Sequence, residues 1–99
     1  MILVRNIFRL KFGKAREAVA IMKDGLAIQK KLGSDVSTRL LTDVTGPFYT
    51  LVLELTVANL ATFETYAPQL FADQDWQANF QKMAPLVESG YREVFTIVE

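Results

Sequence analysis

Residues 36–56 read VSTRLLTDVTGPFYTLVLELT, two apolar runs separated by a short turn signal. The signal is Thr45-Gly46-Pro47, so we predict two strands, 36–44 and 48–56, joined as an antiparallel hairpin. Side chains alternate between the two faces of a strand. One face of this hairpin should therefore carry Arg39, Leu41, Asp43, Thr50, Val52 and Glu54. The other face is more apolar, and we expect it to pack against helices.

The segments on either side of the hairpin extend the pattern. Before it, residues 2–12 alternate as a strand, and residues 14–32 have the apolar spacing of an amphipathic helix. After it, residues 60–87 predict a helix that is interrupted near Pro68 and restarts at Asp73, and residues 91–99 predict a last strand. The order βαββαβ predicts an α+β fold, a four-stranded antiparallel sheet with its helices on one face. A chain of 99 residues is expected to form a single domain, 1–99.

Composition excludes several classes of function. Eleven basic residues balance eleven acidic ones, whereas a nucleic-acid-binding protein needs a basic surface. The sequence contains neither Cys nor His, which removes disulfides, thiolate chemistry, the usual general base and the commonest transition-metal ligands. We therefore expect no metal and no cofactor. The start of the chain lacks the pattern of a signal peptide and no run is long enough to span a membrane, so a cytoplasmic protein is expected.

The sheet face that is turned away from the predicted helices combines large apolar side chains with arginines. Its apolar members are expected to be Leu3, Ile7, Leu41, Phe48, Val52, Val94 and Val98, and its charged members Arg5, Arg9, Arg39, Arg92, Asp43 and Glu54. A patch of this kind is rarely left in water, and a second copy of the chain would cover it through a self-complementary contact. We expect a homodimer whose dimer face includes Arg5, Ile7, Arg9, Arg39, Glu54 and Val94.

The charges of this face leave two interpretations open. Arg39 and Glu54 should pair across neighbouring strands. The remaining excess of arginine fits a hydrated, salt-bridged interface, and it also fits an anionic ligand held between the subunits.

Four residues are candidates for a ligand site on the opposite face. Asn6 is the polar residue among the helix-facing side chains of the first strand, where a polar group needs a partner or a cavity. Tyr66, Trp76 and Phe80 could line an apolar cleft beside it. The alternative for each is structural: a hydrogen-bonded Asn6, and aromatic side chains that simply fill the core.

The sequence resembles a known family at two places. Residues 41–47, LTDVTGP, with the apolar strand after them, and residues 73–77, DQDWQ, look like the NIPSNAP family of the dimeric α/β-barrel superfamily. This resemblance implies two ferredoxin-like subunits packed sheet to sheet, and an activity that is poorly defined. The superfamily also includes cofactor-independent monooxygenases and haem-degrading enzymes. Haem-degrading members use a strand-one Asn, a Trp and a haem-ligating His, for which Asn6 and Trp76 are possible counterparts, but the absence of His argues against haem degradation.

Three functions follow as hypotheses. The first is a domain that binds a small apolar or aromatic molecule between sheet and helices, without established catalysis. The second is a cofactor-independent monooxygenase that acts on an aromatic or quinol-like substrate, with proton transfer by Tyr66, a carboxylate or water. The third is a structural dimerisation module, which would have a closed, filled space between sheet and helices.

Overall fold

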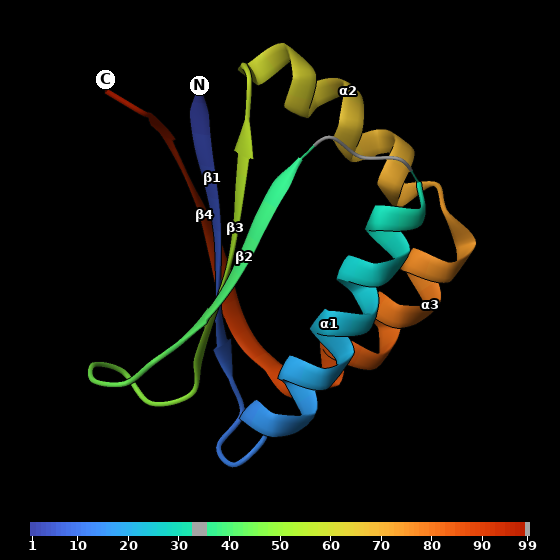
Figure 1. Ribbon diagram of the computed structural model, residues 1–99. Helices are drawn as coiled ribbons and strands as arrows, with labels where there is room; N and C mark the ends of the chain where they lie inside the picture. The colour runs from blue at the N-terminus through green and yellow to red at the C-terminus, as the bar shows by residue number, and fades with distance from the viewer. Residues whose placement is uncertain (33–35, 99) are drawn as a thin grey trace.

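The computed structural model describes residues 1–32 and 36–98, with three α-helices on one side of a four-stranded sheet (Figure 1). Its elements, in chain order, are β1 (Ile2–Leu10), α1 (Ala15–Lys31), β2 (Ser37–Thr42), β3 (Thr50–Val57), α2 (Leu60–Phe71), α3 (Gln74–Met83), the short 3-10 helix η1 (Ala84–Leu86) and β4 (Val87–Thr96). The predicted ferredoxin-like α+β fold is confirmed. Glu99, the last residue of the predicted final strand, lies outside the described residues.

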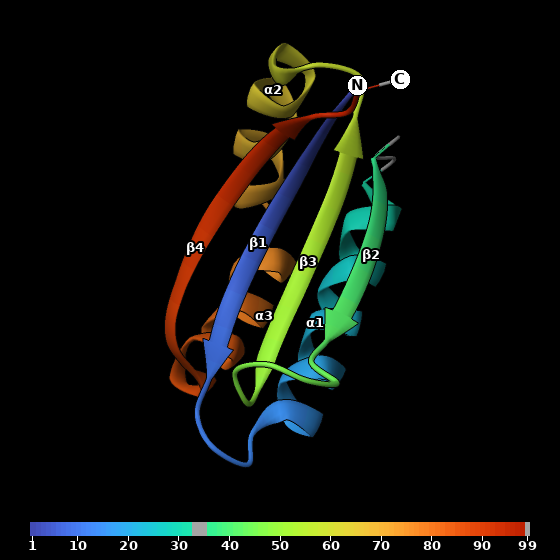
Figure 2. The same ribbon diagram turned by 90° about the vertical axis from the view of Figure 1, so that its left-hand side faces the viewer.

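The sheet is antiparallel throughout, in the order β2-β3-β1-β4. Figure 2 shows it from the side that no helix covers, with all helices behind the strands. In the central hairpin Arg39 lies opposite Glu54 and Leu41 opposite Val52, as the alternation predicted. The sheet therefore has one face toward the helices and one open face.

The hydrophobic core lies between the helix-facing side of the sheet and the helices. Val4 and Leu51 are fully buried in it, in β1 and β3. Its other buried members are Leu10, Ala18, Met22, Leu53, Leu55, Val57, Phe63, Met83 and Leu86. Burial of these side chains supplies the main force that holds the helices on the sheet.

Capping residues set the beginnings of the second and third helices. The Asn59 Oδ1 atom accepts a hydrogen bond of 2.8 Å from the backbone N–H of Thr62, and the Asp73 Oδ1 atom accepts one of 2.9 Å from Trp76. The expected interruption lies at residues 72–73, not at Pro68. The helix continues past Pro68 because this residue is exposed while Leu70 is buried, so packing offsets the missing N–H.

The last strand, β4, differs from the prediction in its first residue and in the faces of its side chains. β4 begins at Val87 instead of residue 91, so Gly90 lies within the strand, and its register against β1 shifts between Arg9 and Leu10. Val94 lies opposite the core residue Val4, and residues directly opposite each other share a face. Its predicted place on the dimer face is therefore wrong. Pro85 lies in the short helix η1 that directly precedes β4. The face of each β4 side chain follows from the pairing of β4 with β1, which the alternation of β4 alone does not specify.

Arg92 also lies on the face opposite to the predicted one, because of the pairing of β4 with β1. It lies opposite Asn6 on the helix side, whereas Glu93 and Tyr91 lie opposite Arg5 and Ile7 on the open face. The open face thus loses one cation and gains one anion relative to the prediction. The expected excess of arginine largely disappears, and with it the main reason to expect an anion held on that face.

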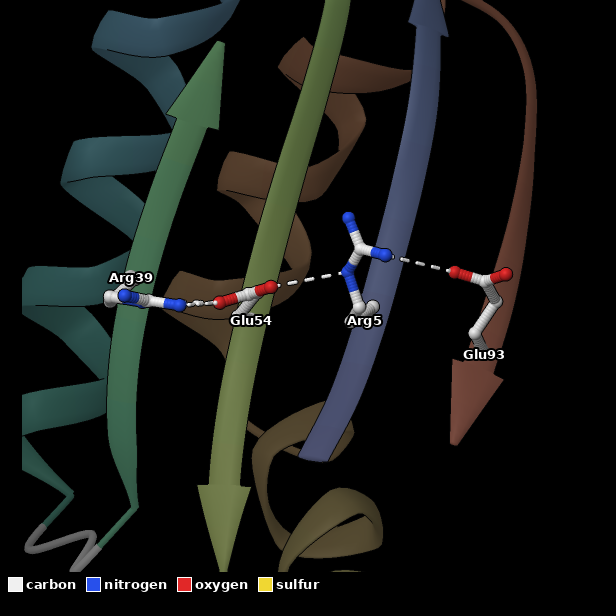
Figure 3. A network of polar contacts seen from close by, with 4 residues as sticks. All are labelled: Arg5, Arg39, Glu54 and Glu93. Carbon is white, nitrogen blue, oxygen red and sulfur yellow. Dashed lines mark hydrogen bonds and ion pairs between the residues drawn. The ribbon is translucent and has the colours of Figure 1, made fainter. Parts of the chain in front are cut away.

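A row of four alternating charges crosses the open face (Figure 3). Glu54, only 6 % exposed, lies between two arginines: the Arg39 Nε atom donates to its Oε1 at 3.1 Å, and the Arg5 Nε atom lies 3.1 Å from its Oε2. The row continues from the Arg5 Nη1 atom to the Glu93 Oε1 atom at 3.3 Å. We call Arg39, Glu54, Arg5 and Glu93 the charge row. Two cationic neighbours compensate the desolvation of the buried Glu54 carboxylate.

Candidate functional site

A cavity of about 710 Å³ lies between the sheet and the helices. This volume falls within the usual range of small-molecule sites, roughly 300–1,000 Å³. Its apolar walls include Phe8, Leu53 and Leu55 from the sheet, Ile21 and Met22 from α1, Phe63, Tyr66, Ala67 and Leu70 from α2, and Trp76, Phe80 and Met83 from α3. The space between sheet and helices is therefore not filled by side chains. A purely structural module would require it to be filled.

Two polar side chains meet on the sheet side of this cavity. The Nε atom of Arg92 donates a hydrogen bond of 2.6 Å to the Oδ1 atom of Asn6. The guanidinium carbon of Arg92 also lies 5.3 Å from the ring centroid of Phe63, within the range of a cation–π contact. Among residues 1–32 and 36–98, no carboxylate forms an ion pair with Arg92. The site thus presents a positive charge beside an aromatic wall.

Close packing of α1 against α3 positions the indole of Trp76 in the wall. The Asn79 Nδ2 atom donates to the backbone carbonyl of Ile21 at 2.9 Å, which joins the two helices. Gly25 makes this approach possible: a Cβ atom at this position would lie 2.9 Å from Asn79 Nδ2 and 3.2 Å from Trp76 Cζ3. The glycine inside α1 is therefore used for helix packing beside the site.

The cavity brings together all four candidate residues of the sequence. Asn6, Tyr66, Trp76 and Phe80 line it, from β1, α2 and α3. The predicted dimer-face residues Arg5, Ile7, Arg9, Arg39 and Glu54 occupy the open face instead. Sequence reasoning missed Arg92 in the cavity, because its side of β4 follows from the register against β1. A signal was nevertheless present, since Asn6 is a polar side chain on an apolar face and calls for a polar partner.

The site offers binding groups more readily than catalytic ones. Its polar lining residues are the amides Asn6, Gln29, Gln77, Asn79 and Gln81, the guanidinium of Arg92, and the phenols Tyr66 and Tyr91. In the part of the chain that the structure describes, no group of three His, Cys, Asp or Glu residues could hold a metal ion. Within the same residues, no helix combines the length and apolar character of a membrane-spanning segment.

Comparison with solved structures places this fold among known ones. An uncharacterised NIPSNAP domain protein from Burkholderia xenovorans superposes with a TM-score of 0.88 at 22% identity, over 99% of this chain and 95% of the other. A NIPSNAP family protein from Agrobacterium tumefaciens gives 0.88 at 23% identity, over 99% and 93%. The fold is NIPSNAP-like.

The NIPSNAP-like fold extends to proteins with a stated activity. SnoaB, a cofactor-independent oxygenase from Streptomyces nogalater, superposes with a TM-score of 0.74 at 14% identity, over 99% of this chain and 93% of the other. At such identities the similarity concerns the fold alone. No family model and no curated protein sequence matches the chain.

We predict that Gly25→Val destabilises the protein and displaces Trp76. The added side chain enters the space of Asn79 and Trp76, and overpacking of this kind costs about 1–3 kcal/mol. Urea unfolding measures the loss, and the fluorescence of Trp76, the only tryptophan in the sequence, reports its displacement. The control is Ala27→Val, at an exposed position of α1, where the change costs about 0.5 kcal/mol through helix propensity. Equal stabilities of the two variants would contradict the packing described here.

Proposed function

We propose that this protein binds a small molecule in the cavity between the sheet and the helices, and that the ligand has an apolar or aromatic body. The support is the cavity itself, about 710 Å³ with walls that are largely aliphatic and aromatic. Apolar clefts with a few convergent polar groups are the usual form of small-molecule sites. Asn6, Tyr66, Trp76 and Phe80 are the proposed ligand contacts.

The presence of Arg92 in the cavity lining indicates that the proposed ligand also carries an anionic oxygen. The Nε atom of Arg92 is engaged by Asn6, which holds the guanidinium in place, while no carboxylate among the described residues neutralises it. A guanidinium forms its strongest hydrogen bonds with carboxylates and related anions. Arg92 is an exposed residue among those that line the cavity, so a ligand can reach its remaining N–H groups. An aromatic carboxylate, or another aromatic molecule with an anionic oxygen, therefore suits the site best.

We expect biphenyl-4-carboxylate to bind more tightly than its neutral amide, biphenyl-4-carboxamide, because only the first carries a charge for Arg92. In Arg92→Gln the affinity for the carboxylate should fall about 10- to 100-fold, as expected for a lost charged hydrogen bond of about 1.5–3 kcal/mol, while the amide is affected little. Titration calorimetry measures both probes.

The controls for this experiment separate charge from volume. Arg16→Gln removes an exposed arginine of α1 that does not line the cavity, and it should leave both affinities unchanged. Ala67→Phe fills part of the cavity and should weaken both probes. If the carboxylate and the amide bind equally, the role of Arg92 is wrong. If Ala67→Phe weakens neither, the cavity is not the site.

A second candidate function is a cofactor-independent monooxygenase that acts on an aromatic or quinol-like substrate. Asn6 and Trp76 line one cavity, and the fold is shared with an oxygenase, although that likeness concerns the fold alone. Without His or Cys, proton transfer would depend on Tyr66, a carboxylate or water. Oxygen consumption with a panel of anthrols and quinols, without added metal or flavin, tests this function. Turnover that is lost in Asn6→Ala would support catalysis, and no turnover across the panel would leave binding as the function.

We also propose that a second copy of the chain covers the open face of the sheet. Figure 2 shows this face free of helices, and the side chains of Tyr91 and Phe95 are 60% and 45% exposed there. Four strands of this length span roughly 600 Å² before side-chain relief is counted. This is comparable with the roughly 800 Å² that each partner buries in a stable complex. A homodimer would remove these aromatic side chains from water.

Phe95→Asp should shift the protein from dimer to monomer, because it places a charge in the proposed interface without removing a core side chain. Light scattering should give twice the 11.2 kDa chain mass for the unaltered protein and about 11.2 kDa for the variant. Leu60→Asp is the control, since Leu60 is 49% exposed at the start of α2, away from the open face. A monomeric unaltered protein, or an unchanged dimer in Phe95→Asp, would contradict the proposal.

A further inference from the structure

One glutamine of α1 is buried at a position where an apolar residue is expected. The buried residues of α1 are Ala18, Met22, Gly25 and Gln29, which lie on one stripe at intervals of three and four residues. Such a stripe is the helix face that packs on the rest of the protein. Gln29 is 4 % exposed and belongs to the lining of the cavity. Its amide is therefore withdrawn from bulk water, on the side of α1 that faces the cavity.

The Gln29 side chain lacks a hydrogen-bond partner within residues 1–32 and 36–98. The other buried polar side chains of these residues are engaged, Glu54 by two arginines and Asn79 by the Ile21 carbonyl. A glutamine amide offers two N–H donors and one carbonyl acceptor. Buried polar groups are nearly always hydrogen-bonded, because water is lost from them without compensation otherwise. The partner of Gln29 is thus a group that enters the cavity, which is water in the empty site and a ligand atom in the occupied one.

Gln29 and Arg92 lie in different parts of the cavity. The exposed members of the lining include Phe80, Gln81, Tyr91 and Arg92, so the cavity opens between α3 and β4. Figure 2 shows β4 at one edge of the sheet and α1 behind β2 and β3, toward the other edge. β4 and β3 are two strand spacings apart, about 10 Å. The cavity therefore has a charged group at its opening and a neutral amide in its buried part.

We infer that the ligand carries two polar groups, an anionic oxygen that faces Arg92 at the opening and a neutral hydroxyl that Gln29 binds in the buried part. This inference rests on the ligand-binding function proposed above, and it adds a residue that determines specificity. A body of two aromatic rings, linked or fused, suits the separation of the two groups.

The chemistry of the lining favours a neutral group beside Gln29. In the part of the chain that the structure describes, Arg92 is the only charged residue that lines the cavity. A second charge on the ligand would lose its hydration near Gln29 without gaining a countercharge. A hydroxyl avoids this cost, and it can donate to the amide oxygen or accept from the amide nitrogen.

The same amide discriminates against ligands that are apolar at their buried end. Such a ligand displaces water from Gln29 and leaves the donors and the acceptor of the amide unpaired. A site that hydrogen-bonds a hydroxyl rejects an analogue without it for this reason, more strongly than an apolar pocket rejects a small difference in size. Gln29 thereby sets which aromatic carboxylates bind.

Paired probes test this discrimination by titration calorimetry. They are biphenyl-4-carboxylates with a hydroxyl at position 3′ or 4′, each compared with the analogue that has a methyl group at the same position. All four carry the same carboxylate, and the methyl group matches the hydroxyl in size. We expect at least one hydroxyl probe to bind about 5- to 100-fold more tightly than its methyl analogue.

Gln29→Met removes the amide while it keeps an unbranched side chain of similar length that is compatible with a helix. In this variant the methyl probe should bind at least as tightly as the hydroxyl probe. Its urea midpoint without ligand should not fall, since the amide contributes no hydrogen bond within residues 1–32 and 36–98. The control is Gln69→Met, the same substitution at an exposed position of α2 that does not line the cavity, and it should keep the preference for the hydroxyl.

The outcomes separate this inference from the proposed function. Equal preference in the unaltered protein and in Gln29→Met would overturn the role of Gln29, even where Ala67→Phe weakens the probes and so supports binding in the cavity. The same loss of preference in Gln69→Met, or a lower urea midpoint in Gln29→Met, would also overturn it, the second by assigning the amide to the fold. If none of the four probes binds, the proposed function fails, and the inference fails with it.

Discussion

The two faces of the sheet depend on two adjacent residues of the central strand β1. Alternation along a strand sends the side chains of Arg5 and Asn6 to opposite faces. Arg5 bridges Glu54 and Glu93 on the open face, and Asn6 holds Arg92 at the cavity on the other. Because β1 pairs with both β3 and β4, a slip of one residue in either pairing would bring wrong partners to both faces at once.

The fold was largely readable from the sequence, because the signals that specify it are local. The hairpin around Gly46-Pro47 and the helix start at Asp73 both have the predicted role. The position of β4 was not readable in this way. β4 follows directly after the short helix η1, and its register against β1 includes a shift at Arg9 and Leu10, so neither its start nor its register is encoded in the alternation of β4 alone.

That single difference changed the prediction for the site more than for the fold. Asn6, Tyr66, Trp76 and Phe80 converge on the cavity as expected, since they come from segments whose faces were assigned correctly. Arg92 joins them only because β4 is in the observed register, and Glu93 completes the charge row for the same reason. Because the faces of β4 were assigned the wrong way round, the sequence analysis placed Arg92 at the dimer interface instead of at the cavity. The NIPSNAP-like fold, shared at low identity, could not have corrected it, because similarity of fold does not identify the residues of a site.

The separation of the faces gives the protein room for two kinds of contact. The cavity lies between the sheet and the helices, and the open face lies on the other side of the sheet; Tyr91, on the edge strand β4, contributes to both. The register of β4 against β1 is the common requirement of both, and cross-strand nuclear Overhauser contacts in solution measure it directly. The account predicts contacts that pair Asn6 with Arg92 and Arg5 with Glu93. Contacts that pair Asn6 with Tyr91 or Glu93 would return Arg92 to the open face and contradict it.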